Sequence, residues 1–187
     1  MAQGRASRVF NRIDQIEYRW CQQFNQSLGF PLITGYFRLV SWLGNGWFWY
    51  CLILLLPLNH GWAGWKLAAV MTLTGIVCTL LYKLLKTALV RERPFISFPV
   101  IQCATAPLDR YSFPSGHSLH AVCFNLLLLH YLPLIGWLVL PFSLCVLASR
   151  VILGLHYPSD VLAGSLVGTI CALAAIALTG EIDLQGL

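Results

Sequence analysis

Residues 118–149 have the sequence SLHAVCFNLLLLHYLPLIGWLVLPFSLCVLAS and contain no Lys, Arg, Asp or Glu. The run is longer than one helix needs to cross the roughly 30 Å hydrocarbon core of a bilayer, for which about 20 residues suffice. Pro133, Gly136 and Pro141 divide it, and such residues mark helix ends and turns. The stretch therefore predicts two short membrane-spanning helices joined by a tight turn at YLPLIG, residues 131–136.

The composition of the 187-residue chain also indicates a membrane protein. Hydrophobic residues make up 58% and charged residues 10%, whereas about 25% of the residues of a soluble domain are charged. A soluble protein of this length could not bury so much apolar surface, so that class is excluded. Only helices and closed barrels cross lipid, and the long apolar runs lack the alternation of barrel strands.

Three further apolar segments, 39–59, 61–82 and 161–180, are long enough to cross the membrane. The last is rich in Ala and Gly, which allow close helix packing in lipid. With the two helices of 118–149, they predict an all-α fold, a polytopic transmembrane helical bundle of about five to six spans. The expected membrane-embedded domain covers residues 39–180.

Residues 1–38 are expected to form an N-terminal amphipathic or interfacial segment. In residues 1–27, apolar side chains are interspersed with charged ones, which is typical of a helix on the membrane surface; the alternative is a disordered cytosolic tail. The segment lacks the apolar core of a signal peptide. Residues 181–187, EIDLQGL, are expected to form a short acidic tail.

Cysteine and charge patterns argue against two kinds of site. The seven cysteines are scattered through apolar runs without C-x-x-C spacing, which favours packing over zinc or redox sites. The net charge is +5, but no basic platform interleaved with aromatic residues indicates nucleic-acid binding. We therefore expect no metal, no cofactor and no nucleic-acid partner.

The predicted topology gathers the polar segments at one membrane face. The end of the 61–82 span, the helix start near residue 117 and the turn after residue 149 emerge on the same side. Ionisable groups at the membrane boundary are costly, so their concentration indicates function. The three segments are KTALVRERP (86–94), PSGH (114–117) and SRVILGLHYPSD (149–160).

The residue types in these segments suit a tetrahedral oxyanion such as phosphate. Lys86, Arg93 and Arg150 supply positive charge, and the planar guanidinium matches phosphate oxygens. Ser115 and Gly116 stand where a helix begins, so their backbone N–H groups and the helix dipole favour an anion. Taken singly, each has a simpler explanation: the cations could face lipid headgroups, and Ser115 could be a helix cap.

Two histidines are candidate reactive groups. His156 and Asp160 are four residues apart, so the carboxylate could hold one imidazole nitrogen while the other faces the phosphorus. His117 could protonate the leaving oxygen, which would complete a two-step hydrolysis without a metal. Alone, His117 and Asp160 could merely favour a helix start. The other histidines are interpreted as interfacial or structural: His60, His120 and His130.

Together the three segments resemble the signature of the type 2 phosphatidic acid phosphatase superfamily, to which the vanadium haloperoxidases are related. The motifs cover residues 86–160, and the helix pattern extends the resemblance to roughly 40–180. The blocks are intact and in order: Lys86, six residues and Arg93-Pro94; Pro114-Ser115-Gly116-His117; and Ser149-Arg150, five residues, His156, three residues and Asp160.

The resemblance implies a helical-bundle membrane phosphatase that acts on lipid phosphates without a metal cofactor. It implies His156 as the nucleophile that becomes a phosphohistidine, Asp160 as its orienting partner and His117 as the general acid. The phosphate-binding residues that it implies are Lys86, Arg93, Arg150, Ser115 and Gly116.

The predicted topology departs from the usual pattern of this family. Many bacterial members have six spans, and the first is replaced here by the surface helix. Five spans place the N-terminus on the side of the site, which the family usually directs away from the cytoplasm. Arg5, Arg8, Arg12 and Arg19 favour the cytoplasm instead. Three explanations stay open: an extra partial crossing at 30–44, an arginine-rich tail outside the cytoplasm, or a site that faces inward.

We therefore expect an integral membrane lipid phosphate phosphatase in the bacterial inner membrane, with its site at the periplasmic face. The expected partners are the bilayer and a phosphorylated lipid: undecaprenyl pyrophosphate, phosphatidylglycerol phosphate, phosphatidic acid or a lipid A phosphate. The chain of the lipid would meet uniform apolar surface, so the sequence does not choose among them. The alternatives are a lipid phosphotransferase with the same phosphohistidine, a halogenating enzyme like the soluble haloperoxidases, and a non-catalytic lipid-binding or transport protein.

Overall fold

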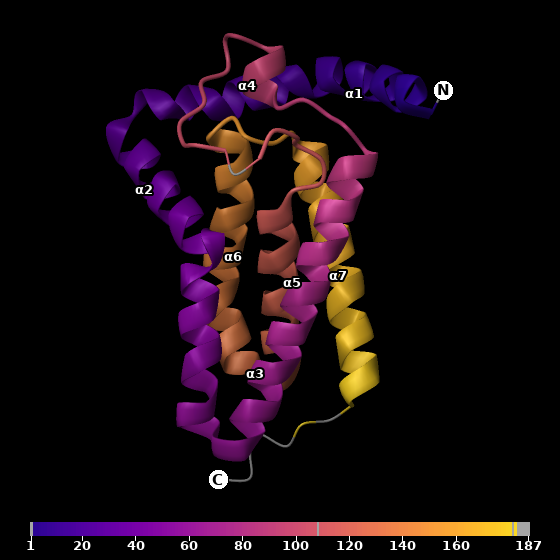
Figure 1. The fold of residues 1–187 in the computed structure, drawn as a ribbon. Coiled ribbons are helices and arrows are strands. Elements are labelled where there is room, and N and C mark those ends of the chain that lie inside the picture. Colours follow the sequence, from indigo (N-terminus) through magenta and orange to yellow (C-terminus); the bar gives the residue numbers. More distant parts are fainter. Residues whose placement is uncertain (1, 108, 181, 183–187) are drawn as a thin grey trace.

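The computed structural model describes residues 2–107, 109–180 and 182, which form helices, turns and loops with no strand among them (Figure 1). The expected tail, 181–187, lies outside these residues except for Ile182, and so do the side chains of Arg5 and Arg8. The predicted all-α bundle with an N-terminal surface helix is confirmed.

Helix α1 (Ala2–Asn25) lies across one end of the bundle, almost perpendicular to the other long helices (Figure 1). The 3₁₀ turn η1 (Gln26–Gly29) connects it to α2 (Pro31–Trp42). In α1, the side chains of Asp14, Cys21 and Asn25 are buried against the bundle. The apolar side chains of Ile16 and Trp20 are exposed instead. Apolar side chains that face outward suit a helix in the membrane interface.

The first crossing of the bundle is a continuous, kinked helix. It starts with α2, passes through the π-helix η2 (Leu43–Trp47) and continues into α3 (Phe48–Ala88). The extra partial crossing suggested at 30–44 does not form, because α2 is one end of this crossing (Figure 1). At His60–Gly61 the chain reverses, with Gly61 at a φ of 51°, and the rest of α3 makes the second crossing. A positive φ is readily adopted by glycine.

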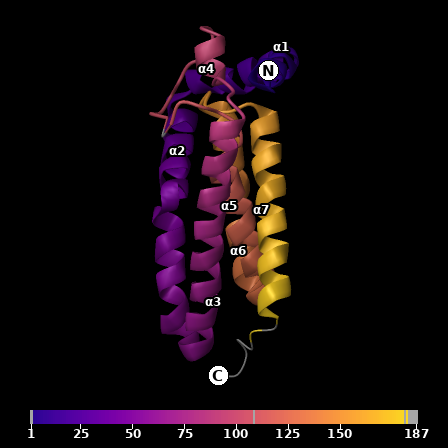
Figure 2. The same ribbon diagram turned by 45° about the vertical axis from the view of Figure 1, so that its right-hand side comes forward.

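Three more long helices belong to the bundle: α5 (Gly116–Tyr131), α6 (Pro133–Ile152) and α7 (Pro158–Thr179). Among the described residues, the helical stretch Pro31–Ala88, α6 and α7 are long and apolar enough to cross a membrane, and the reversal within α3 divides the first of these into two crossings. The predicted break between two helices is confirmed, because α5 ends at Tyr131 and α6 begins at Pro133. The break is shorter than predicted, because Gly136 and Pro141, which were expected to divide the run, lie inside α6. Figure 2 shows α2, α3, α5, α6 and α7 running side by side, with α1 across their end.

Close packing of α7 on α5 depends on glycine. A Cβ on Gly164 would come within 2.4 Å of the Ser115 carbonyl oxygen, and one on Gly168 within 2.3 Å of the Leu119 carbonyl oxygen. The prediction that small residues bring this helix close to its neighbours is therefore confirmed. The opposite side of α7 is apolar and exposed, with Leu162 at 69% and Leu166 at 63%, as expected for a side chain row in contact with lipid.

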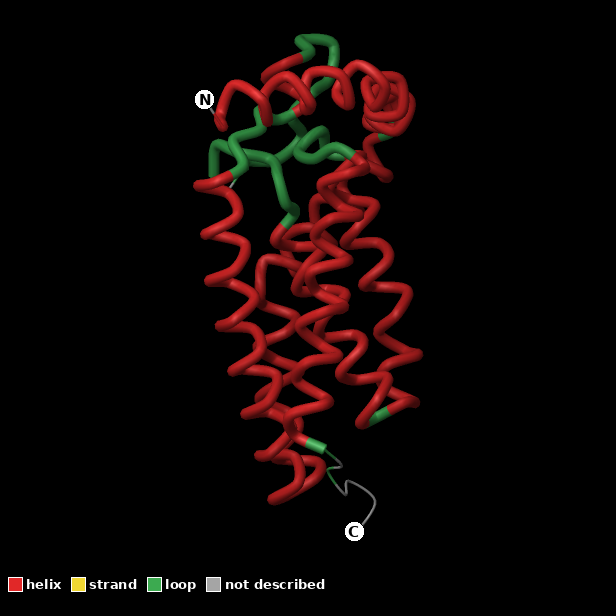
Figure 3. Tube along the Cα trace, turned by 90° about the vertical axis from the view of Figure 1, so that its right-hand side faces the viewer, coloured by secondary structure: helices red, strands yellow, loops and turns green. Residues whose placement is uncertain are grey.

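The loops of the chain gather at the end of the bundle that α1 covers (Figure 3). The short helix α4 (Pro94–Ser97), the segments 98–107 and 109–115 and the turn 153–157 all lie there. The three segments that the sequence analysis singled out therefore meet at one end, beneath α1.

Candidate active site

The predicted site residues lie at the α1 end of the bundle, on four different elements. Lys86 is in the last turn of α3, and Arg93 directly precedes α4. Ser115 caps α5, which begins with Gly116 and His117. The remaining three flank the turn between the last two helices: Arg150 in α6, His156 in the turn and Asp160 in α7.

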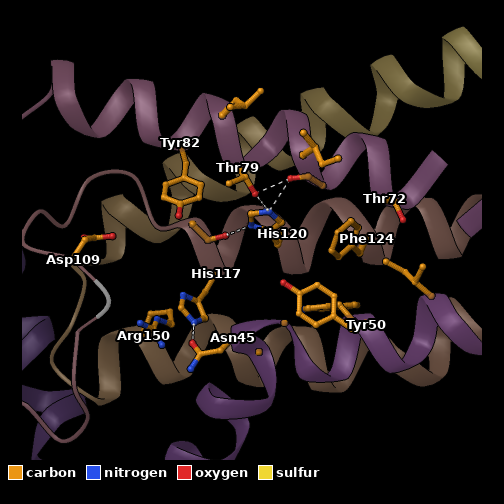
Figure 4. Close-up of a pocket in the computed structure, with 18 of the residues that line it drawn as sticks. Asn45, Tyr50, Thr72, Thr79, Tyr82, Asp109, His117, His120, Phe124 and Arg150 are labelled. Carbon is orange, nitrogen blue, oxygen red and sulfur yellow. Dashed lines mark hydrogen bonds between the residues drawn. The ribbon is translucent and has the colours of Figure 1, made fainter. Parts of the chain in front are cut away.

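A cavity of about 640 Å³ is lined by all of these residues except Ser115 and Asp160, and it extends into the bundle. At its polar end it is lined by Lys86, Arg93, Gly116, His117, Arg150 and His156. Tyr50 and Phe124 lie away from the His117 end of the cavity (Figure 4). The lining also includes the apolar side chains of Trp49 and Ile76. Such a cavity can hold an anionic headgroup at one end and an apolar chain along the other.

His156 is buried and presents one ring nitrogen to the cationic end of the cavity. Its Nε2 lies 3.3 Å from Nη1 of Arg93. Because a guanidinium can only donate, Nε2 accepts through its lone pair and the ring proton is on Nδ1. Burial and the charges of Arg150 and Arg93 hold the pKa of His156 below its ordinary value. The imidazole is therefore neutral at neutral pH, the state that a nucleophile needs.

Asp160 faces His156 but is held mainly by other groups. Its Oδ2 lies 3.6 Å from Nδ1 of His156, which is longer than a hydrogen bond. The same oxygen accepts from the backbone N–H of Tyr157 at 2.8 Å, and Oδ1 accepts from Arg91 at 2.5 Å. The expected direct hydrogen bond between the two residues is thus replaced by a looser contact, because Asp160 also caps the first turn of α7.

Arg93 and Lys86 share a partner that the sequence analysis missed. Nη2 of Arg93 donates to Oδ1 of Asp109 at 2.8 Å, and Nζ of Lys86 donates to both carboxylate oxygens at 2.7 and 2.6 Å. Burial alone would raise the pKa of Asp109, but the hydrogen bonds and charges of the two cations outweigh it and hold the pKa below its usual value. A carboxylate therefore lies where the expected phosphate would bind. Asp109 belongs to a loop without periodicity, so no sequence signal pointed to it.

The other predicted phosphate-binding residues are Arg150, Ser115 and Gly116. Of these, Arg150 and Gly116 line the cavity. Nη1 of Arg150 donates to Oγ of Ser41 at 2.5 Å, while its buried Nε has no partner among the described residues. The Ser115 hydroxyl instead accepts from Ser118 and caps α5, which is the simpler role considered for it.

His117 and His120 both line the cavity (Figure 4). Nε2 of His117 is hydrogen-bonded to Oδ1 of Asn45, which lies in the π-helix between α2 and α3. Asn45 was missed, although an amide between two glycines in an apolar run is an unusual feature. His120 was interpreted as structural, and its Nδ1 lies 2.8 Å from the carbonyl oxygen of Gly116.

Comparisons with known proteins show which family and which folds the chain resembles. The PAP2 superfamily model matches residues 63–182. The chain is 32% identical over 98 residues to the bacitracin transport permease protein BcrC of Bacillus licheniformis, covering 52% of this chain and 48% of the relative. It is 36% identical over 95 residues to the undecaprenyl-diphosphatase BcrC of Bacillus subtilis (strain 168), covering 51% and 48%. The chain spans about half the length of the curated relatives it matches.

Two crystal structures have the same fold. LpxE of Aquifex aeolicus superposes with a TM-score of 0.75 at 25% identity, covering 85% of this chain and 93% of the other. The PAP2-type phosphatidylglycerolphosphate phosphatase of Bacillus subtilis superposes with a TM-score of 0.75 at 24% identity, covering 92% and 89%. The family model covers more than half of the chain and includes every residue of the three motifs. The chain therefore belongs to the PAP2 superfamily.

Proposed function

We propose that this multi-pass membrane protein hydrolyses the phosphomonoester or diphosphate of a lipid through a phosphohistidine at His156. The observation that carries the proposal is the unprotonated Nε2 of His156, 3.3 Å from Nη1 of Arg93 at the polar end of the cavity. A neutral, oriented imidazole beside a guanidinium is what attack on a phosphoryl group requires.

In the first step, Nε2 of His156 attacks the phosphorus and the bond to the leaving oxygen breaks. Arg93, Lys86 and Arg150 offset the charge on the phosphoryl oxygens, and Lys86 and Arg93 exchange the Asp109 carboxylate for them. His117 gives a proton to the leaving oxygen. Its contact with Asn45 supports this role, since it fixes the imidazole in the wall of the cavity.

In the second step, His117 accepts a proton from water, which attacks the phosphohistidine and breaks the P–N bond. Inorganic phosphate leaves, and both histidines return to their starting states. Asp160 stabilises the ring proton on Nδ1 of His156 throughout, and a shortening of the 3.6 Å contact during the reaction would strengthen this effect.

The substrate that we propose first is undecaprenyl diphosphate. The name of the Bacillus subtilis relative supports it, and so does the apolar continuation of the cavity beyond the phosphate end. The other substrates are phosphatidylglycerol phosphate, phosphatidic acid and a lipid A phosphate, and they form the comparison panel.

Phosphate release by purified protein in detergent with EDTA tests the reaction. We expect release that ranks the four lipids and that falls by at least about 10³-fold in His156→Ala. His130→Ala is the matched control, because His130 is exposed at the opposite end of α5. Unchanged release in His156→Ala would exclude the nucleophile, and phosphate transfer to a second lipid would indicate a phosphotransferase.

We propose further that the site faces the periplasm from the inner membrane. The exposed arginines of α1, Arg12 and Arg19, run against the usual preference for the cytoplasm, so the orientation requires a direct test. Cys103 offers one, because it is exposed in the loop at the active-site end. We expect a membrane-impermeant maleimide to label Cys103, but not Cys103→Ser, in intact spheroplasts. Labelling only after permeabilisation would place the site in the cytoplasm.

A further inference from the structure

Arg91 lies at the centre of a buried ionic cluster next to the active site, outside the three-part motif. It is 2% exposed, and all five of its N–H donors have partners. Nε and Nη2 donate to Oδ1 of Asp14 at 2.9 and 2.6 Å, and Nη2 also donates to Oε2 of Glu17 at 2.7 Å. Nη1 donates to Oγ of Ser159 at 2.7 Å and to Oδ1 of Asp160 at 2.5 Å.

The same guanidinium stacks on the residue that follows the proposed nucleophile. The central carbon of the Arg91 guanidinium lies 3.9 Å from the ring centroid of Tyr157, which is fully buried. Arg91 thus contacts both Tyr157 and Asp160, the two groups that flank His156 on its C-terminal side. Its carbonyl oxygen also accepts from the backbone N–H of Ser112, just before the PSGH segment.

Helix α1 holds this arrangement from the other side. Glu17 accepts from the backbone N–H of Ser159 at 2.6 Å and from its hydroxyl at 2.7 Å, so it caps the first turn of α7. Asn25 donates to the carbonyl oxygen of Ile152 at 3.0 Å, near the end of α6. Asp14 and Arg91 are 77 positions apart in the chain, and Glu17 and Ser159 are 142 positions apart. Both pairs are hydrogen-bonded next to the turn that carries His156.

We propose that Arg91 is a positioning residue for the proposed reaction, and that α1 is part of the catalytic unit through Asp14 and Glu17. The proposal rests on the proposed function. A single guanidinium bridges α1 to Asp160 and Tyr157, so it sets where Asp160 stands relative to Nδ1 of His156. A displacement of about 1 Å in a reacting group can lower a rate about 100-fold.

The first test is a comparison of kcat and KM for phosphate release from undecaprenyl diphosphate. Arg91→Lys keeps the charge but cannot bridge three carboxylates, and it should lower kcat about 10- to 100-fold with KM changed by less than about twofold. Asp14→Asn combined with Glu17→Gln should lower kcat in the same way and serves if Arg91→Lys does not fold. Arg19→Gln is the matched control, because Arg19 is exposed on α1.

The second test uses orthovanadate binding, measured by calorimetry, and needs no turnover. Vanadate can adopt the five-coordinate geometry of phosphoryl transfer, so its binding depends on the placement of His156. In Arg91→Lys we expect affinity for vanadate to fall at least about tenfold and affinity for inorganic phosphate to change by less than about twofold.

The outcomes separate the two proposals. If the wild-type protein releases no phosphate from any lipid but Arg91→Lys weakens vanadate selectively, the proposed function fails and the positioning role stands. If both variants keep wild-type kcat and vanadate affinity, the positioning role is overturned. An equal loss of vanadate and phosphate affinity overturns it too, because Arg91 would then only maintain the cavity. A wild-type protein that binds neither anion and releases no phosphate overturns both proposals.

Discussion

Two clusters of ion pairs lie next to His156, one at the cavity and the other enclosed between helices. The open cluster consists of Lys86, Arg93 and Asp109, and the closed cluster consists of Arg91, Asp14, Glu17 and Asp160. The Asp109 side chain is 36% exposed, whereas the Asp160 side chain is 0% exposed. Their arginines are two residues apart in an extended segment, yet Arg93 lines the cavity and Arg91 binds α1.

The clusters differ in access as well as in charge, because two cations share one carboxylate in the open cluster and three carboxylates share one cation in the closed cluster. The carboxylate of the open cluster belongs to a loop, so an incoming phosphate can displace it from Lys86 and Arg93. The carboxylates of the closed cluster belong to α1 and α7, and moving them would separate two packed helices. Ion pairs that solvent and ligand reach serve binding, and those that neither reaches serve architecture.

Among the variants of the two clusters, Arg91→Ala should lower the free energy of unfolding the most. Arg91→Ala leaves three buried carboxylates around a lost cation, and breaking a buried ion pair costs about 3–5 kcal/mol. Arg93→Ala should cost much less, because Asp109 can turn toward solvent. Thermal unfolding in detergent, followed by circular dichroism, measures both. Equal losses of stability would contradict the division into open and closed clusters.

For turnover we expect the larger losses in variants of the anion site, although these variants lose less stability than Arg91→Ala. Arg93→Ala and Arg150→Ala each remove charge stabilisation at the phosphoryl group, and such a loss lowers kcat/KM by about 10²–10³-fold. Both variants should keep the melting profile of the wild type more closely than Arg91→Ala does. Arg110→Ala is the control, because Arg110 is exposed in the same loop as Asp109. A full rate in Arg93→Ala would remove Arg93 from the anion site.

The open cluster was largely predictable from the sequence, and the closed one was not. Lys86 and Arg93 were found because they follow the end of a predicted span and because their spacing matches the first block of the family signature. Arg91 belongs to the same basic run, together with Lys83. Three roles in one run cannot be separated by charge alone: Lys83 is exposed, Arg93 lines the cavity and Arg91 is enclosed.

The helices themselves followed from local signals. Pro133 and Pro158 are the first residues of α6 and α7, because proline suits the first turn of a helix. The contacts that complete the site join distant parts of the chain, such as Asp14 with Arg91 and Asn45 with His117. Sequence spacing carries no information about such pairs, so α1 was predicted as a surface helix without its link to Asp160.

The pH dependence of turnover tests the charges that act on His156. Because burial and the charges of Arg150 and Arg93 lower the pKa of His156, the neutral form persists below the ordinary imidazole value of about 6.5. The acid limb of kcat/KM should therefore lie below about pH 6.5. Arg93→Gln removes one positive charge and should move this limb to higher pH, whereas the control Arg110→Gln should not. An acid limb above the ordinary value would mean that Asp160 and Asp109 outweigh the cations.

The same pKa shift has a consequence for stability. Unfolded His156 binds a proton more readily than folded His156, so acid favours the unfolded state. This contribution is constant above about pH 6.5 and becomes unfavourable as the pH falls toward the lowered folded pKa. His156→Ala should therefore lose less stability than the wild type between neutral and mildly acidic pH, which thermal unfolding at several pH values measures.

The smallest effect is expected on inhibition by inorganic phosphate when Asp109, the carboxylate of the open cluster, is replaced. Asp109→Asn removes the anion that competes with phosphate for Lys86 and Arg93, and a partly exposed ion pair is worth about 0.2–1 kcal/mol. Inhibition by inorganic phosphate should therefore tighten by up to about fivefold. Glu92→Gln removes an exposed charge nearby and is the matched control. Weaker inhibition in Asp109→Asn alone would mean that the carboxylate holds the two cations in place for the phosphate, and the open cluster would then be architectural like the closed one.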